Sequence, residues 1–176
     1  MLNPKTLPAN GADRKHTISV LVENRPGVLA RVSGLFARRG FNIDSLAVCT
    51  TEDAAVSRMT VVAKGDDRTL QQLVKQLDKL VDVITILDHT DDDLIEREIA
   101  LIKVNATVDN RSEIMQLATI FRADVVSITP RDESIVLEVT GDSAKVDAFL
   151  EALAKFKILE LVRTGTIALV RGGRRT

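Results

Sequence analysis

A repeat within the sequence limits the folds that this chain can adopt. The pair Gly65-Asp66 precedes a run of apolar residues at helical spacing, and Gly141-Asp142 precedes a second such run 76 positions later. Every member of the first run has an apolar counterpart at this displacement: Leu70, Leu73, Val74, Leu77 and Leu80 correspond to Val146, Phe149, Leu150, Leu153 and Phe156. Self-similarity at a fixed displacement indicates two copies of one structural unit, and 176 residues are enough for two small domains.

Strand and helix patterns alternate in each half. Ile18, Val20 and Val22 recur at every second position, as in a half-buried strand. Further strands are predicted at 43–49, 55–63 and 83–87, and in the second half at 100–104, 125–128 and 134–140. A helix is predicted after Pro26 in the first half, and a corresponding helix is predicted in the second half. These two helices are expected to bury Leu29, Val32, Leu35 and Phe36, and Ile114, Leu117, Ile120 and Phe121.

The order βαββαβ, found twice, predicts an α+β fold of two ferredoxin-like domains, each with four antiparallel strands and two helices on one face. We expect a flexible leader at 1–15, a first domain at 16–90, a second at 95–172 and a tail at 173–176. The acidic stretch 88–94 is expected to be a solvated linker. A small sheet of this kind leaves an edge and a face uncovered, so a second unit or a dimer partner is expected there.

Composition narrows the function classes. The net charge is −1, so no strong field attracts nucleic acid or an anionic membrane. Cys49 is the one cysteine, which excludes an intramolecular disulfide and fits a cytoplasmic protein. No apolar run reaches the ~18–20 residues of a membrane span.

The turn Asn24-Arg25-Pro26-Gly27 is the candidate ligand site. It joins a strand to a helix, and the first N–H groups of a helix are unpaired and carry partial positive charge. A carboxylate or phosphate is their natural partner, and Gly27 lets an anion approach the backbone. Asn42 and the carbonyl groups near Ile43 could accept hydrogen bonds from a ligand ammonium. The alternative is that Asn24 only caps the helix and Pro26-Gly27 only turns the chain.

Catalytic and metal-binding residues are not evident. We expect Cys49 to be a small core side chain, and His16 and His89 to lie on the surface, so that neither would activate a cysteine nucleophile. Three consecutive aspartates in 91–93 are more typical of solvated chain than of a metal site. No catalytic residue, metal ligand or cofactor is therefore predicted in this chain. Arg31, Arg38 and Arg39 are expected on the polar side of the first helix.

Two other function classes fit less well. An acylphosphatase-like enzyme of ferredoxin-like fold would need an arginine and an asparagine to cradle phosphate. Arg25 and Asn24 could be drawn in those roles, but the loop is short for a phosphate cradle. An RNA-recognition module would stack bases on exposed aromatic side chains, and this chain has no Tyr or Trp.

Four segments carry a family resemblance: 24–46, 57–60, 75–83 and 97–104. The longer segment 18–46, which contains the first of them, looks like the start of an ACT domain, a βαββαβ module that senses amino acids. Taken together, the four resemble the small regulatory subunit of acetolactate synthase (acetohydroxyacid synthase) over about residues 16–172. An ACT-domain sensor of a different enzyme or regulator is the alternative, and only the longer match argues against it.

The resemblance implies a dimer that binds valine, and often leucine or isoleucine, where two N-terminal domains meet. It also implies a partner, the catalytic subunit, which uses thiamine diphosphate, magnesium and FAD and which this chain stimulates and makes sensitive to feedback inhibition. The implied effector contacts are Asn24, Gly27, Val28 and Leu29 of one chain, and Asn42 and Ile43 of the other. Arg25 and Pro26 receive no ligand contact, because the family varies there.

Overall fold

The computed structural model describes residues 14–173. Within these bounds the chain forms two compact units. The first runs to Leu94 and takes in the chain from Val170, and the second runs from Ile95 to Leu169. The expected leader therefore lies mostly outside the described residues, but β1 begins at Arg14, inside the stretch expected to be flexible.

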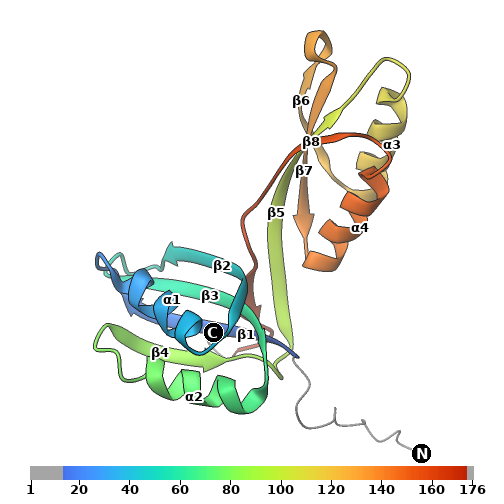
Figure 1. Ribbon diagram of the computed structural model, residues 1–176. Helices are drawn as coiled ribbons and strands as arrows, with labels where there is room; N and C mark the ends of the chain where they lie inside the picture. The colour runs from blue at the N-terminus through green and yellow to red at the C-terminus, as the bar shows by residue number, and fades with distance from the viewer. Residues whose placement is uncertain (1–13, 174–176) are drawn as a thin grey trace, which may run out of the picture. The chain divides into compact units, whose positions relative to one another are not determined.

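The first unit has the predicted order βαββαβ (Figure 1). Its sheet has the strand order β2-β3-β1-β4 with antiparallel neighbours, so β2 and β4 are the edge strands. The elements are β1 (Arg14–Glu23), α1 (Val28–Arg38), β2 (Asn42–Thr50), β3 (Val56–Gly65), α2 (Asp67–Leu77) and β4 (Val83–Asp88).

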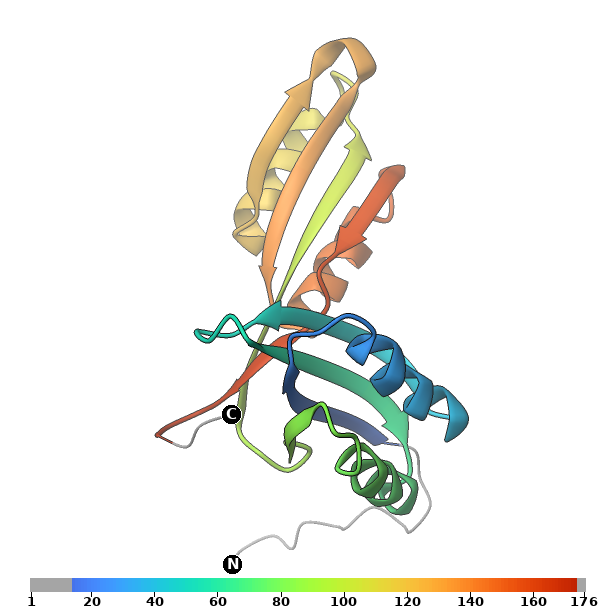
Figure 2. The same ribbon diagram turned by 90° about the vertical axis from the view of Figure 1, so that its left-hand side faces the viewer.

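The second unit repeats this order and adds a short strand (Figures 1 and 2). Its sheet has the order β6-β7-β5-β8, and β9 pairs with β5 beside this path. The elements are β5 (Leu94–Asn105), α3 (Arg111–Phe121), β6 (Asp124–Thr129), the 3-10 helix η1 (Pro130–Asp132), β7 (Ser134–Gly141), α4 (Ser143–Leu153), β8 (Ile158–Arg163) and β9 (Ile167–Val170). The predicted fold of two ferredoxin-like domains is confirmed, and β9 is an addition to it.

Each unit has its own hydrophobic core between the sheet and its two helices. In the first, alternate residues of β1 and β3 meet Phe36 of α1 and Leu73 of α2, which are fully buried. In the second, Ala100, Ile102 and Val104 of β5 are fully buried together with Phe149 of α4. Because both helices of a unit contribute to one core, they cover one face of its sheet.

The repeated Gly-Asp pair starts the second helix of each unit. The side chain of Asp66 accepts a hydrogen bond from the Thr69 amide at 2.9 Å, and that of Asp142 accepts one from the Lys145 amide at 2.8 Å. Both are N-caps, which satisfy amides that a helix start otherwise leaves unpaired. The hydroxyl and amide of Thr69 lower the pKa of the Asp66 carboxyl by hydrogen bonding to it.

Two helix faces differ from prediction by a residue or two. Leu29 is 42% exposed, and Val28 is buried in its place with Val32 and Phe36. Val28, Val32 and Phe36 are spaced by four and lie on one side of α1, whereas Leu29 lies about 100° further round the helix. In α3, Ile120 is 72% exposed and the smaller Ala118 is buried.

The expected linker at 88–94 is a tight turn between β4 and β5. The His89 amide donates to the carbonyl of Thr17 at 2.9 Å, and the Asp92 amide donates to the carbonyl of His89 at 3.0 Å. The acidic side chains of this stretch have partners: Asp88 accepts from Thr90, Asp91 pairs with Arg14, Asp92 with His89 and Asp93 with Arg171. The stretch ends where the first unit gives way to the second, and it makes specific contacts while the side chains of Asp91 and Asp93 remain 89% and 73% exposed.

Candidate functional site

Gly27 occupies the N-cap position of α1 in a left-handed conformation, with φ of 86° and ψ of −10°. Side chains other than glycine rarely adopt this conformation. Space is not the constraint, because a Cβ atom at Gly27 would meet its nearest neighbour, Nη1 of Arg31, at 3.7 Å. The turn therefore requires glycine for its backbone shape, and Gly27 itself is exposed to solvent.

The N-terminus of α1 lacks the features that neutralise a helix start. No side chain caps it, and its first turn contains no acidic residue. In contrast, α2 and α4 have aspartate caps, and α3 has Glu113 in its first turn. The first amides of α1 and the partial positive charge of its dipole are thus without an anionic side chain.

Asn24 does not cap this helix. Its amide group donates from Nδ2 to the carbonyl of Ala54 at 3.0 Å, and its backbone N–H donates to the carbonyl of Ala55 at 2.7 Å. Both acceptors belong to the loop between β2 and β3. Asn24 therefore fastens that loop to the turn before α1, and the interpretation of Asn24 as a helix cap is wrong.

Val28 and Leu29 follow the turn and face different environments. Val28 is 2% exposed and belongs to the core, whereas the side chain of Leu29 is largely open to solvent. Leu29 thus presents apolar surface beside the helix N-terminus, while Val28 holds the first turn of α1 against the sheet.

Asn42 and Ile43 lie at the opposite end of the same sheet. Glu23, just before the turn, pairs with Val56, whereas Asn42 pairs with Lys64 near the other end of β3. Asn42 is exposed and donates from Nδ2 to Oδ1 of Asp44 at 3.0 Å. Within one chain, the structure therefore does not bring Asn42 and Ile43 together with Asn24, Gly27, Val28 and Leu29.

Arg31 is a neighbour of the turn that the sequence analysis assigned only to the polar side of α1. Its Nη2 forms an ion pair with Oδ2 of Asp82 at 2.7 Å, and its Nη1 lies 3.7 Å from the position that a Cβ atom on Gly27 would take. The two residues are four apart on a helix, which places them on the same side. The four-residue spacing from Gly27 to Arg31 could have predicted from the sequence that Arg31 lies beside the turn. Arg31 adds a positive charge beside the helix N-terminus.

Three residues considered for catalysis are placed differently from prediction. Cys49 is exposed and not in the core. The preceding residue, Val48, pairs with Met59 of the core, so Cys49 and its partner Arg58 lie on the other face of the sheet. His16 and His89 are buried and not on the surface, with exposed fractions of 0% and 1%. Their partners are backbone and side-chain oxygens of Gly65, Thr90 and Asp92.

Neither a metal-binding cluster nor a membrane-spanning helix was found in residues 14–173. No group of three or more histidine, cysteine, aspartate or glutamate side chains there could hold a metal ion. No helix in this part of the chain is long and apolar enough to cross a membrane.

Two family models match the chain, one in each unit. The model for the ACT domain of AHAS small subunit-like proteins matches residues 18–85, and the model for the small subunit of acetolactate synthase matches residues 97–172. The first match contains all six residues of the candidate effector site.

Similar proteins and a solved structure agree with these models. A probable acetolactate synthase small subunit of Archaeoglobus fulgidus is 53% identical over 92% of this chain and 99% of its own length. The acetolactate synthase small subunit of Mycobacterium bovis is 48% identical over 92% of this chain and 95% of its own. The crystal structure of the small subunit from Thermotoga maritima has 40% sequence identity and a TM-score of 0.82, over 92% of this chain and 99% of that one. The chain belongs to the acetolactate synthase small-subunit family, whose members are regulatory and not catalytic subunits.

Proposed function

We propose that this chain binds valine, or the related leucine or isoleucine, and transmits its presence to an acetolactate synthase catalytic subunit. In this proposal the chain stimulates the catalytic subunit and makes it subject to feedback inhibition. Thiamine diphosphate, magnesium and FAD are bound by the catalytic subunit, and this chain holds no cofactor. The observation that carries the proposal is the uncapped, positively polarised N-terminus of α1 in a chain of this family.

The chemistry of an α-amino acid fits this position. Its carboxylate would accept hydrogen bonds from the first amides of α1, where the left-handed Gly27 leaves the backbone accessible. Arg31 adds a positive charge nearby, although Asp82 already shares it. The exposed side chain of Leu29 offers an apolar contact for a branched aliphatic group. These features favour a small apolar amino acid over a phosphate ester.

The complete site requires two chains. Asn42 and Ile43 lie at the other end of the sheet from Gly27, so one chain cannot supply both halves. We propose a homodimer in which Asn42 and Ile43 of one chain lie beside the α1 N-terminus of the partner. Their oxygens would then accept hydrogen bonds from the ligand ammonium.

Reconstitution tests the function directly. The purified chain alone is expected to convert no pyruvate. Added to a separately purified catalytic subunit, it is expected to raise the rate of acetolactate formation and to make that rate fall when valine is present. Pyruvate turnover by the chain alone, or a catalytic subunit whose rate is unchanged by saturating chain, would contradict the proposal.

Mixed dimers test whether the site is shared. Gly27→Asp places a carboxylate at the α1 N-terminus, and Asn42→Ala removes the polar group proposed to come from the partner. Each homodimer is expected to bind valine weakly. A mixed dimer of one chain of each kind is expected to bind one valine with wild-type affinity, because one of its two sites then has both halves intact. Calorimetric titration of doubly tagged, purified mixed dimers measures this stoichiometry.

The mixed dimer also has a clear negative outcome. If both residues served a site within one chain, every site of the mixed dimer would carry one substitution, and no wild-type affinity would be recovered. A chain that sediments as a monomer at micromolar concentration would contradict the homodimer itself.

A further inference from the structure

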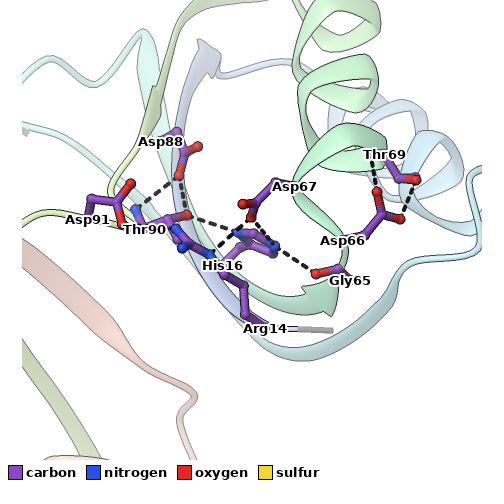
Figure 3. Close-up of polar contacts among 9 residues, drawn as sticks. All are labelled: Arg14, His16, Gly65, Asp66, Asp67, Thr69, Asp88, Thr90 and Asp91. Carbon is purple, nitrogen blue, oxygen red and sulfur yellow. Dashed lines mark hydrogen bonds and ion pairs between the residues drawn. The ribbon is translucent and has the colours of Figure 1, made fainter. Parts of the chain in front are cut away.

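His16 is a buried ionisable residue at the end of the first sheet opposite the Gly27 turn. It lies near the start of β1, where Arg14 pairs with Gly65, whereas the Gly27 turn follows the other end of this strand. The side chain is fully buried. Its Nε2 lies 2.9 Å from the carbonyl oxygen of Gly65, and its Nδ1 lies 3.0 Å from Oγ1 of Thr90 (Figure 3). The ring therefore joins the end of β3 to the turn between β4 and β5.

Charged residues of α2, β1 and β4 lie near the ring (Figure 3). Oδ1 of Asp67, in the first turn of α2, lies 3.7 Å from Nε2. Arg14, on the same strand as His16, forms ion pairs with Asp67 at 3.0 Å and with Asp91 at 2.9 Å. Asp88, at the end of β4, accepts hydrogen bonds from the hydroxyl and, at 3.0 Å, from the amide of Thr90. The ring of Phe41 lies edge-on at 6.5 Å between centroids.

Counting hydrogens shows that the protonation state of His16 decides how many of these bonds form. The Gly65 carbonyl can only accept, so Nε2 must carry a hydrogen. The single hydroxyl hydrogen of Thr90 can go either to Asp88 or to Nδ1. If His16 is charged, Nδ1 donates to Thr90, Thr90 donates to Asp88, and all three bonds form. If His16 is neutral, one of the three is always missing.

The second unit has a permanent ion pair at the corresponding place. Ile18 pairs with Asp88 and Ala100 pairs with Arg163, at the last residue of the fourth strand of each unit. His16 precedes Ile18 by two residues in β1, and Glu98 precedes Ala100 by two residues in β5. Both side chains are buried. Glu98 pairs with Arg163, which also contacts Asp147 at 2.8 Å. Burial alone would lower the pKa of Arg163, but hydrogen bonds to Glu98 and Asp147 outweigh it and raise that pKa above its ordinary value.

The two units thus have different polar groups at the equivalent position: a histidine in the first, and a glutamate paired with an arginine in the second. Arginine and glutamate keep their charges throughout the neutral range, whereas histidine ordinarily changes charge near pH 6.5. We propose that His16, Thr90 and Asp88 form a proton-dependent latch, in which the charged imidazole fastens the β4–β5 turn to the first unit. This turn is the segment through which the chain enters β5 and the second unit.

The sign of the pH dependence follows from the bond count. The charged form makes one more hydrogen bond, so the latch is stronger with the charged ring than with the neutral ring, and deprotonation is expected to weaken it. The carboxylates of Asp67 and Asp88 offset the cost of holding charge on a buried ring. Protonation of His16 is thereby coupled to how firmly the β4–β5 turn is held in place.

Ring-nitrogen NMR and amide hydrogen exchange on the full chain test the latch. The chain has two histidines, so His89→Gln assigns the ring signals. Spectra at pH about 5.5 and about 8.5, on either side of the range in which histidine ordinarily changes charge, show whether one or both ring nitrogens of His16 carry a proton. The latch is expected in the state with two protonated nitrogens. The protection factor of the Thr90 amide, which corrects for the intrinsic exchange rate, is expected to fall about fivefold to tenfold over this range, the ratio for one lost hydrogen bond.

Substitutions at Thr90 provide the matched control. Thr90→Val keeps the shape but has no hydroxyl, and it is expected to abolish the pH dependence of the protection factor. Thr90→Ser keeps the hydroxyl and is expected to retain it. The proposal fails if wild-type protection is the same at both pH values, or if its pH dependence survives unchanged in Thr90→Val or in His16→Gln.

Discussion

Gly27→Asp is expected to abolish valine binding while the first unit remains folded. The new carboxylate would stand at the N-terminus of α1, where the proposal puts the carboxylate of the ligand. Like charges brought together in a binding site cost several kcal/mol, so affinity should fall by about 100-fold or more. Aspartate tolerates a positive φ better than most residues, and the strain at φ of 86° should cost about 1 kcal/mol. Calorimetric titration with valine measures the loss, and circular dichroism confirms folding.

Gly27→Asn is the matched control for this prediction. Asparagine has nearly the shape of aspartate and a similar tolerance of the left-handed conformation, but it carries no charge. It is expected to weaken binding much less than Gly27→Asp does. A folded Gly27→Asp chain with wild-type affinity would remove the turn from the effector site. Equal losses in both variants would show that bulk or strain, and not charge, is responsible.

The fold was predictable because its signals are local or repeated. Residues at every second position, Ile18, Val20 and Val22, define β1 without reference to any other segment. The two aspartate caps start α2 and α4 at positions that the repeat displacement had already linked. Such patterns depend on backbone geometry within about ten residues, and this is the range over which a single sequence is most informative.

The errors at helix faces have a common physical origin. Val28 and Leu29 are both apolar, and the spacing to Val32 and Phe36 fits a stripe that begins at either. The choice depends on how the helix lies on the sheet, and in the structure Val28 is the residue turned toward the core. In α3, Ala118 is buried and Ile120, which was expected in the core, is exposed. Which of them is buried depends on the space between the helix and the sheet.

The buried histidines could not be found from local pattern. The oxygens that face His16 are 49 and 74 residues away along the chain, and they meet it only when β3 and the β4–β5 turn are in place. A polar residue at a strand end is ordinarily exposed, so burial was the less expected outcome. The six effector residues remain a prediction, because the part of the site proposed to come from a second chain is not tested by one chain.

Phe36→Ala is expected to destabilise the first unit by about 3–5 kcal/mol, the usual cost of removing a fully buried phenylalanine. The Phe36 side chain extends from α1 into the core and packs edge-on against Phe41, with 6.3 Å between the ring centroids. The free energy of unfolding of a domain is commonly only about 5–15 kcal/mol, so this substitution removes a large part of it and raises the unfolded fraction. Hydrogen exchange followed by mass spectrometry is expected to show faster exchange in residues 14–94, and valine binding should be lost as that unit opens.

Phe149→Ala is the matched variant in the second unit. Phe149 is equally buried, and its ring centroid lies 5.0 Å from that of Phe121. It belongs to the core of the second unit, which shares no residue with the core of the first. Its loss should cost a similar free energy of unfolding and speed exchange in residues 95–169. Valine affinity should nevertheless stay near the wild-type value, because the candidate site lies wholly in the first unit of each chain. If Phe149→Ala removes valine binding while residues 14–94 keep their protection, the effector site must include residues of the second unit.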